Sequence, residues 1–420
     1  MTIERQADVV VIGGGVIGLC TAYYLREAGR RVTVLEKETV DTGTSCGNAG
    51  MLVPSHVVPL AAPGVVAQGL RWLFNPESPF YIKPRLDRAL ASWLWRFRGF
   101  CTERHTRASM PLLRDLSLTS VELFADLAGL DGLDFLFERR GLLMLHNSEK
   151  GRKANHKYAV LAREVGLEVD ELDAEELETL EPELKSPATG AVYFRQDAHL
   201  DPGCFAGGLS RYLEQHGVTI HTGTEVLGFE HQGRRLSAVK TTHGNIEAED
   251  VVLAAGSWSP GLGRSLRLRL PVQPAKGYSV TLPHTGPRLR IPTILSEAKV
   301  TITPMGGRIR FGGTLELAGF DASINRRRAA SILKVIPAYI PGVDPAGIRD
   351  ADIWSGYRPC TPDGLPLLGR PAAWENLVVA TGHAMIGITL APITGKLVAE
   401  IVGHEAPSID IHALNVDRFA

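Results

Sequence analysis

The chain has 420 residues, of which 44% are hydrophobic and 22% are charged, with a net charge of -1. These values are typical of a globular protein of two domains and exclude a disordered or fibrous chain. They give no basic excess for nucleic-acid binding, and no apolar run in the sequence suits a membrane span or a signal peptide.

The first predicted elements form a strand–turn–helix–strand unit in residues 8–36. DVVVI is a β-branched run typical of a buried strand, VIGLCTAYYLREAG has helical spacing, and RVTVLE is a second strand. The turn between the first strand and the helix has the pattern G-x-G-x-x-G, formed by Gly13, Gly15 and Gly18.

This unit predicts a dinucleotide site. Gly13 permits the tight turn, Gly15 lets the backbone approach a pyrophosphate, and Gly18 lets the helix pack closely on the strand. The helix N-terminus offers N–H groups to the phosphates, and Glu36 accepts hydrogen bonds from the ribose hydroxyls. A glycine turn in an ordinary βαβ unit is the alternative, and the motif alone does not separate NAD from FAD.

A small, polar, glycine-rich segment, TGTSCGNAG, follows at residues 42–50. Such a loop fits against a flat ring system, with Ser45 and Asn48 as hydrogen-bonding groups. A flexible surface loop is the alternative interpretation of the same composition.

A second βαβ-like passage is predicted at about 197–256. A helix begins near Pro202 and stops at Gly217, and the strand VTIHTGTEV follows it. A buried strand then leads into AAGSW, which places a second turn of small residues near the dinucleotide.

The C-terminal part contains a strand, NLVVAT, a turn, GHAMIG, and a helix, ITLAPITGKLVAEIVG. The helix beginning at Gly387 to Thr389 would direct backbone N–H groups at the negative charge of a reduced flavin. A plain strand–helix unit is the alternative. The preceding stretch 354–369, WSGYRPCTPDGLPLLG, is predicted to be a loop because of its prolines and glycines, and its one positive charge is Arg358.

Together these residues resemble the D-amino acid oxidase superfamily of FAD enzymes, and within it the D-amino acid dehydrogenase branch. The resemblance runs nearly end to end. It rests on VVVIGGGVIG, SCGNAG, AAPGVVAQGLRWLFNPESPF, KGYSVTLP, GYRPCTPDGLPLLG and GHAMIGITLAPITGKLVAE.

The resemblance implies FAD-dependent oxidative deamination of a D-amino acid, with electrons passed to a quinone or another acceptor. It implies that Arg358 holds the substrate carboxylate, that Tyr278 lines the substrate site and hydrogen-bonds the carboxylate, and that His383 lies by the flavin. A core tyrosine with a satisfied hydroxyl and a loop histidine in contact with backbone alone are the alternatives for the last two.

The cofactor-binding residues that we expect from the motifs and the resemblance fall in several separate segments of the chain. They are Gly13, Gly15, Val16, Ile17, Gly18, Glu36, Lys37, Thr44, Ser45, Asn48, Ala49, Gly50, Val226, Ala255, Gly256, Trp258, Gly382, Gly387, Ile388 and Thr389.

Some residues depart from the pattern of the branch. Cys46 and Gly47 stand where other small or aromatic residues are frequent, and GITLAP replaces a GWTMAC type of helix start. Substrate size and oxidant therefore stay open. We expect non-covalent FAD, with Cys46 as a buried spectator. A glycine or sarcosine oxidase, a hydroxyproline or D-proline dehydrogenase, and a non-catalytic FAD-binding subunit are the alternative functions.

The five cysteines form no C-x-x-C pair, and none has a histidine at zinc-ligand spacing. We therefore expect a reducing, cytoplasmic location and no metal. The aromatic and basic stretch 70–100 is a candidate contact with the inner face of the cytoplasmic membrane, where a quinone accepts electrons. A lid, a contact with a partner helix, and plain packing on the substrate domain are the alternatives.

We expect an α/β protein in which two domains are interleaved. The Rossmann-like FAD-binding domain is expected at 1–85, 197–264 and 352–420. The substrate-binding domain, a mixed β-sheet with helices, is expected at 86–196 and 265–351, with GLLML, GYSVTLP and KVTITPMGGRIRFGGTLELAG as strands.

Overall fold

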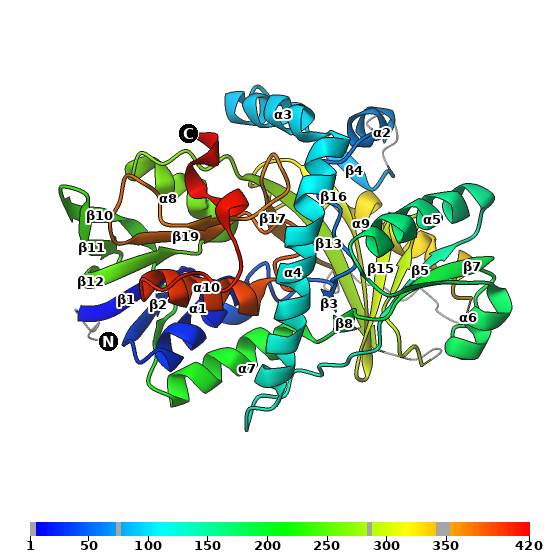
Figure 1. The fold of residues 1–420 in the computed structure, drawn as a ribbon, viewed down its shortest axis with the longest axis horizontal. Helices are drawn as coiled ribbons and strands as arrows, with labels where there is room; N and C mark the ends of the chain where they lie inside the picture. The colour runs from blue at the N-terminus through cyan, green and yellow to red at the C-terminus, as the bar shows by residue number, and fades with distance from the viewer. Residues whose placement is uncertain (1–5, 73–76, 284–287, 342–352) are drawn as a thin grey trace.

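The computed structural model describes residues 6–72, 77–283, 288–341 and 353–420. Residues 73–76 of the aromatic stretch and the expected domain boundary near 351 lie outside the described residues. Two β-sheets stand side by side, and the long helix α4 (Glu103–Ala128) crosses the region between them (Figure 1). The α/β fold with two interleaved sheets is therefore confirmed.

The first sheet is the predicted dinucleotide-binding unit. Its central strand β1 (Gln6–Ile12) pairs in parallel with β2 (Val32–Leu35) and with β12 (Gly244–Leu253). Among the described residues the sheet also contains β9 (Thr219–His221), β10 (Val226–Gln232), β11 (Arg235–Thr241), β18 (Leu367–Gly369) and β19 (Leu377–Thr381). The helices of this unit are α1 (Val16–Glu27), α7 (Pro202–Gln215), α8 (Ser259–Ser265) and α10 (Ala391–Val402).

Tight packing of helices against this sheet positions the glycine turn. A Cβ on Gly18 would lie 1.8 Å from the carbonyl oxygen of Gly13, and one on Gly395 would lie 2.5 Å from the backbone of Cys20. Gly18 therefore brings α1 onto the sheet, as its motif position predicts, and Gly395 brings α10 onto α1.

The second sheet forms the other half of the molecule. Its described strands are, in spatial order, β17 (Ile353–Cys360), β13 (Gln273–Pro283), β16 (Arg308–Leu317), β15 (Val300–Met305), β14 (Thr293–Leu295), β5 (Leu142–His146), β7 (Gly190–Phe194) and β6 (Val169–Leu172). The short strand β4 (Phe80–Ile82) pairs with β16, and the separate ribbon β3 (Met51–Leu52) with β8 (Ala198–His199) lies apart. Helices α2 (Val65–Trp72), α3 (Arg88–Phe100), α5 (Glu149–Glu164), α6 (Ala174–Leu180) and α9 (Arg326–Lys334) surround it (Figure 1).

The prediction of a loop over 354–369 was wrong for residues 354–360 and 367–369, which are strands, whereas residues 361–366 between them lie in no helix or strand. Residues up to Cys360 form β17, which pairs with β13 so that Arg358 stands opposite Ala275. Proline is tolerated there because β17 is an edge strand of its sheet, where an amide hydrogen is dispensable. The second sheet thus takes in β4 and β17, which the expected division assigned to the cofactor domain.

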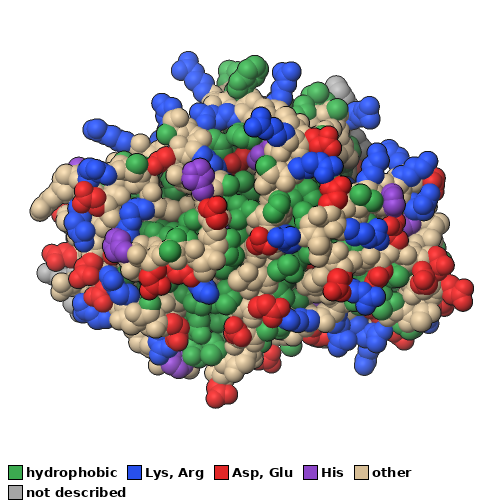
Figure 2. All heavy atoms as spheres, viewed as in Figure 1, with side chains coloured by type: hydrophobic (Ala, Val, Ile, Leu, Met, Phe, Trp, Pro, Cys, Tyr) green, Lys and Arg blue, Asp and Glu red, His purple; other side chains and the backbone are tan. Residues whose placement is uncertain are grey.

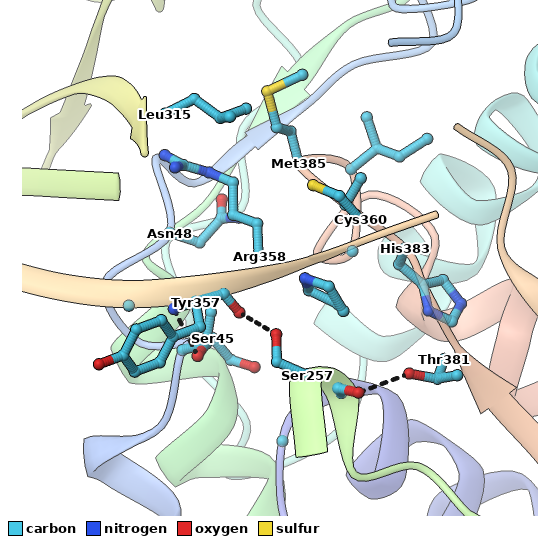
Figure 3. Close-up of a pocket in the computed structure, with 18 of the residues that line it drawn as sticks. Ser45, Asn48, Ser257, Leu315, Tyr357, Arg358, Cys360, Thr381, His383 and Met385 are labelled. Atoms are coloured by element: carbon cyan, nitrogen blue, oxygen red, sulfur yellow. Dashed lines mark hydrogen bonds between the residues drawn. The ribbon is translucent and has the colours of Figure 1, made fainter. Parts of the chain in front are cut away.

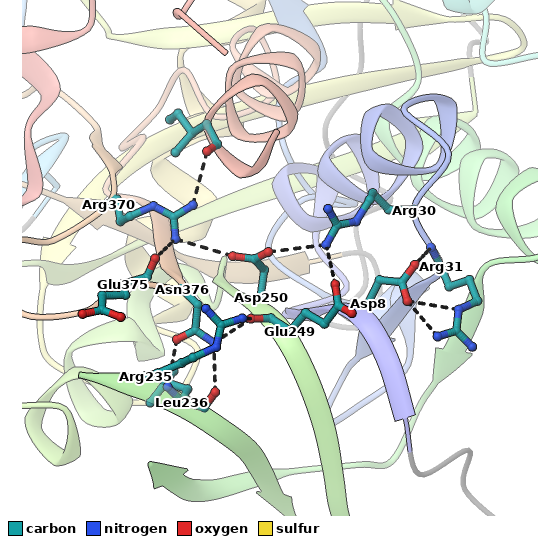
Figure 4. A network of polar contacts seen from close by, with 11 residues as sticks. Asp8, Arg30, Arg31, Arg235, Leu236, Glu249, Asp250, Arg370, Glu375 and Asn376 are labelled. Carbon is teal, nitrogen blue, oxygen red and sulfur yellow. Dashed lines mark hydrogen bonds and ion pairs between the residues drawn. The ribbon is translucent and has the colours of Figure 1, made fainter. Parts of the chain in front are cut away.

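Charged side chains gather at the outer end of the first sheet. Arg30 contacts Glu249 and Asp250, and Arg370 also reaches Asp250 (Figure 4). These pairs tie β12 to the end of α1 and to the segment after β18. Asp250 stands opposite Val9 in β1, whereas the dinucleotide motif follows Ile12 at the end of that strand, so we assign these pairs to the support of the sheet.

Figure 2 shows hydrophobic side chains projecting at the top of the molecule over α3, with basic side chains on either side. Trp95 is 73% exposed and Leu70 of α2 is 58% exposed. Within the described residues no helix is both long and apolar enough to cross a membrane.

Candidate active site

A cavity of about 840 Å³ lies between the two sheets. It begins at the carboxyl ends of β1 and β2, where the dinucleotide motif lies, and continues to β13, β16 and β17 of the second sheet. Most of the expected site residues line it. They are Gly13, Gly15, Val16, Ile17, Glu36, Lys37, Thr44, Ser45, Asn48, Ala49, Val226, Ala255, Gly256, Trp258, Tyr278, Arg358, His383, Gly387 and Ile388.

Four of the expected cofactor residues, Gly18, Gly50, Gly382 and Thr389, are not among those that line the cavity. Gly50 and Gly382 have φ values of +77° and +81°, so each supplies a left-handed turn beside the cavity. The Thr389 hydroxyl accepts from the amide of Val53 at 3.2 Å and donates to the carbonyl of Met51 at 3.3 Å. These residues shape the walls of the cavity from behind.

The glycine turn has the geometry that its motif predicts. Gly13 has φ +116°, and a Cβ there would lie 2.6 Å from the carbonyl oxygen of Ala254. Gly15 is the N-cap of α1 and has no side chain, so apart from the Val16 amide, which bonds Ser45, N–H groups of the first turn are available to a phosphate. Glu36 fixes the turn from β2, since its carboxylate accepts from the amide of Gly14 at 2.7 Å.

The 42–50 segment is an ordered wall and not a flexible loop. The Ser45 hydroxyl accepts from the amide of Val16 at 3.1 Å, and the Thr44 hydroxyl accepts from the amide of Tyr357 at 3.3 Å. The Asn48 side chain accepts from the amide of Gly50 at 2.9 Å. The segment therefore connects the start of α1, which packs on the first sheet, to β17 of the second sheet.

Arg310 of β16 holds the same segment from the second sheet, and sequence reasoning missed it. Its guanidinium donates to the carbonyls of Cys46 at 2.8 Å and Asn48 at 2.7 Å. Burial lowers its pKa. Ser279 of β13 adds a hydrogen bond to the carbonyl of Gly47 at 2.9 Å. An arginine in a strand gives no local signal of such a contact, because the partners lie about 260 positions away in the chain.

Gly47 has a specific packing role. A Cβ on Gly47 would lie 2.0 Å from the ring of Trp354, and one on Gly356 would also lie 2.0 Å from it. The indole of Trp354 is thus held between two glycines at the wall of the cavity. Neighbouring Cys46 does not line the cavity, and burial raises the pKa of its thiol to about 11.

The small-residue turn after β12 meets β17 and β19, as Figure 3 shows. The Ser257 hydroxyl donates to the carbonyl of Tyr357 at 3.0 Å, and the Thr381 hydroxyl donates to the carbonyl of Gly256 at 2.9 Å. Lys37 lies 4.0 Å from the ring centroid of Trp258. This turn closes the cavity on the side of the first sheet.

The C-terminal helix begins later than expected. Helix α10 starts at Ala391, and residues 387–389 form a turn before it. In that turn the amides of Gly387 and Ile388 make no hydrogen bond to any of the described residues. Both residues line the cavity, so N–H groups are available there, although they belong to the turn and not to the helix itself.

Arg358 lies in the cavity on the second-sheet side. Its Nη1 atom donates to the carbonyl of Thr314 at 3.1 Å, and the guanidinium packs over Gly277, where a Cβ would lie 1.7 Å from Nη1. No carboxylate of the described residues pairs with it. Burial lowers the pKa of Arg358, yet a guanidinium remains charged at neutral pH.

Tyr278 is placed differently from its expected role. Its side chain leaves β13 on the face opposite to Gly277, and its hydroxyl contacts the Glu316 carboxylate at 3.3 Å and accepts from the Asn325 amide at 3.0 Å. Burial raises its pKa to about 12. The residue lines the cavity, but its hydroxyl is satisfied elsewhere, which fits the alternative of a core tyrosine.

His383 lines the cavity and is almost fully buried. Its Nε2 atom lies 3.0 Å from the hydroxyl of Thr394 in α10, and Figure 3 shows its ring turned away from the Arg358 guanidinium. Burial lowers its pKa to about 3, so the imidazole is neutral. Its ring therefore supports α10, and its backbone faces the cavity.

The wall beside Arg358 is apolar. Leu315 stands opposite Phe80 where β16 pairs with β4, and both line the cavity. Trp93 of α3 is anchored by a hydrogen bond from its indole to the carbonyl of Cys360 at 2.9 Å. Other apolar lining residues on this side include Leu60, Val65, Val66, Leu70, Ile82, Leu94, Phe97, Leu317 and Met385.

The cavity fits FAD on three observations of this chain. The first turn of α1, whose N-cap is Gly15, is suited to a pyrophosphate, and the carboxylate of Glu36 at the end of β2 is suited to ribose hydroxyls. The volume of about 840 Å³ extends from this motif to Arg358, so an extended cofactor and a small acid can share it. Among the described residues no cluster of three histidine, cysteine or acidic side chains is arranged to hold a metal ion.

Comparison with known proteins agrees with this geometry. A family model described as DAO, FAD dependent oxidoreductase, matches residues 8–401. The D-amino acid dehydrogenase of Granulibacter bethesdensis is 33% identical over 418 residues, covering 98% of this chain and 99% of that protein. The D-amino acid dehydrogenase of Methylobacterium radiotolerans is 36% identical over 420 residues, covering 98% and 99%.

The fold is also shared with solved structures. Glycine oxidase from Geobacillus kaustophilus has a TM-score of 0.78 at 26% identity and covers 99% of both chains. L-proline dehydrogenase from P. horikoshii has a TM-score of 0.76 at 21% identity, covering 99% of this chain and 98% of that one. The family match over nearly the whole chain and the site built around the dinucleotide motif lead to one conclusion: this protein belongs to the DAO family of FAD-dependent oxidoreductases.

Proposed function

We propose that this protein oxidises D-amino acids with apolar side chains to 2-oxo acids and ammonia. The observation that carries the proposal is Arg358, a cation in a cavity with no carboxylate partner among the described residues. A desolvated guanidinium is costly without an anion, and it binds a carboxylate through two parallel hydrogen bonds. The names of the curated relatives support an amino acid of D configuration.

In the proposed reaction Arg358 binds the substrate carboxylate and fixes the direction of the Cα–H bond. The side chain of the substrate lies against the apolar wall formed by Leu315, Phe80 and their neighbours, which also excludes water. FAD, when bound, supplies the acceptor for the hydride that leaves Cα. The amino group enters neutral, so that loss of hydride and of one N–H proton gives an imino acid. Water then adds, and ammonia leaves.

Residues of both sheets would hold the cofactor. We assign the pyrophosphate to Gly13 and Gly15, and the ribose to Glu36. The Ser45–Asn48 segment and the 387–388 turn would face the ring system. Hydride transfer depends on how closely the reacting atoms approach, so the main contribution of the chain is positioning. His383 is neutral, and its role in this proposal is to hold α10.

The proposed electron acceptor is a quinone at a membrane surface. The surface on and beside α2 and α3 exposes three large apolar side chains, Trp95, Leu70 and Leu86. Three arginines are exposed beside them, namely Arg71, Arg88 and Arg98. Val66 and Leu94 of the same helices line the cavity. An exposed apolar surface flanked by arginines favours contact with anionic lipid, and it adjoins the cavity that a quinone would enter.

A glycine or sarcosine type of oxidase is the second candidate. The structural similarity to glycine oxidase, at 26% identity, favours it. The apolar wall beside Arg358 favours a substrate with a side chain. Proline-type substrates are a third possibility on the same fold, because they too present a carboxylate to an arginine.

The test is anaerobic reduction of the bound flavin by a panel of D- and L-amino acids, glycine, sarcosine and D-proline. The proposal predicts bleaching of the flavin spectrum by D-leucine, D-phenylalanine and D-alanine, and none by the L forms. Bleaching by glycine or sarcosine alone would favour the second candidate. No bleaching by any amino acid would contradict the proposal. Turnover with a quinone analogue without peroxide would identify a dehydrogenase, and rapid peroxide formation an oxidase.

A further inference from the structure

The strand β16 contains an irregularity where it passes Arg358. Lys276 pairs with Glu316 and Tyr278 pairs with Gly313, so that Gly277 faces two residues, Thr314 and Leu315. An extra residue of this kind is a β-bulge, which bends a strand and redirects its side chains. Both residues of the bulge line the cavity.

Thr314 has a strained backbone conformation in this bulge. Its φ is +62°, a left-handed conformation that is rare for any β-branched residue and is favoured by glycine. A strained conformation persists only where the surrounding structure imposes it, and such residues concentrate at functional sites. In this conformation the Thr314 carbonyl accepts a hydrogen bond from Arg358 Nη1 at 3.1 Å.

The side chain of Thr314 is also unusual, because its buried hydroxyl lacks a hydrogen-bond partner among the described residues. The residue is 9% exposed. A buried hydroxyl without a partner is unfavourable by about 1–3 kcal/mol. Because Thr314 lines the cavity and its carbonyl holds Arg358, a ligand bound to the guanidinium lies beside this residue and can provide the missing partner of its hydroxyl.

We propose that Thr314 is a second substrate-binding residue, whose hydroxyl donates a hydrogen bond to the carboxylate held by Arg358. The same residue orients the guanidinium through its carbonyl, so the bulge presents one carbonyl to Arg358 and one hydroxyl to the substrate. This inference rests on the proposed function for the identity of the ligand as an amino acid. Independently of the amino acid, we infer that a carboxylate in this cavity forms hydrogen bonds with the side chains of both Arg358 and Thr314.

The test uses the FAD-loaded full-length protein and benzoate, a carboxylate that cannot be oxidised. Binding is read from the change in flavin absorbance, and KM and kcat are measured with D-alanine. Thr314→Val removes the hydroxyl at nearly constant shape. Thr314→Gly also removes it and suits the left-handed backbone, so it guards against loss of folding in the valine variant. Thr314→Ser keeps the hydroxyl.

A matched control is Thr303→Val on the neighbouring strand β15. Thr303 is fully buried and, like Thr314, has a hydroxyl with no partner among the described residues, but it does not line the cavity. We expect Thr314→Val and Thr314→Gly to weaken benzoate binding and raise KM by about 10-fold or more. Thr314→Ser and Thr303→Val should stay within about 3-fold of the wild type.

Equal benzoate affinity in the wild type, Thr314→Gly and Thr314→Val would overturn the inference, and so would an absence of benzoate binding by the wild type. Failure of the proposed function gives a different pattern. There the wild type binds benzoate, and the Thr314 variants weaken that binding, but no amino acid reduces the flavin.

Discussion

Gly277 offers the sharpest test of how the substrate arginine is held. A Cβ at this position would lie 1.7 Å from Arg358 Nη1 and 2.3 Å from Cζ, well inside any allowed contact. The backbone of Gly277 lies in β13 and is not left-handed, so alanine itself fits the strand. Gly277→Ala must therefore move the guanidinium and little else.

The size of the effect follows from the bonds that the guanidinium would lose. A carboxylate bound by two charge-assisted hydrogen bonds is stabilised by about 1.5–3 kcal/mol for each bond. Displacement that breaks both bonds costs at least about 3 kcal/mol, which corresponds to a rise of roughly 10²-fold in KM. FAD binding should change little, because the dinucleotide motif lies in the other sheet.

The assay is anaerobic reduction of the flavin by D-alanine, measured in a stopped-flow instrument, beside FAD content and Tm. The control is Gly307→Ala in the turn between β15 and β16, where an added Cβ meets no atom within 4 Å. It should match the wild type. If the Gly277→Ala protein binds D-alanine as tightly as wild type, the position of the guanidinium does not determine substrate binding.

The remaining predictions concern the cofactor segment and the core. Glu36→Gln should weaken FAD binding by about 10-fold, measured by fluorescence titration, and unchanged affinity would contradict its assignment to the ribose. Arg310→Met should lower FAD affinity at least as much, because it removes the hydrogen bonds that hold the carbonyls of Cys46 and Asn48. A lower Tm with unchanged FAD affinity would show that Arg310 only stabilises the fold. Burial raises the pKa of Asp197 to about 7, so the folded protein retains a proton there that the unfolded chain loses near pH 4, and stability falls as pH rises between these values. In urea denaturation Asp197→Asn should therefore gain roughly 4 kcal/mol over wild type from pH 4 to pH 7, and a constant difference would contradict the buried carboxyl.

The first sheet was predictable because its signals are local. The β-branched run of β1, the glycine turn and Glu36 lie within about thirty residues, and together in that order they favour a dinucleotide-binding unit. The same holds for α7, whose N-terminal cap at Asp201 is followed by Pro202. The structure places these segments as expected, apart from small shifts at element ends such as the start of α10.

Features of the second sheet could not be predicted from the sequence, because they depend on how distant strands pair. Prolines and glycines near Arg358 suggested a loop, whereas pairing with β13 makes that segment an edge strand. Thr314 looked like an ordinary strand residue, because a bulge is a property of register between two strands. The Tyr278 hydroxyl turns to Glu316 for the same reason, since the strand face on which a side chain lies depends on register.

The central claim is that Arg358 binds the carboxylate of the substrate. It is tested most directly by comparing D-alanine with D-alaninamide, which lacks the negative charge, in wild type and Arg358→Leu proteins of equal FAD content. Wild type should prefer D-alanine by roughly 10²-fold in kcat/KM, and the variant should lose this preference because its activity falls on D-alanine alone. A variant that still prefers D-alanine as strongly as the wild type would contradict the assignment.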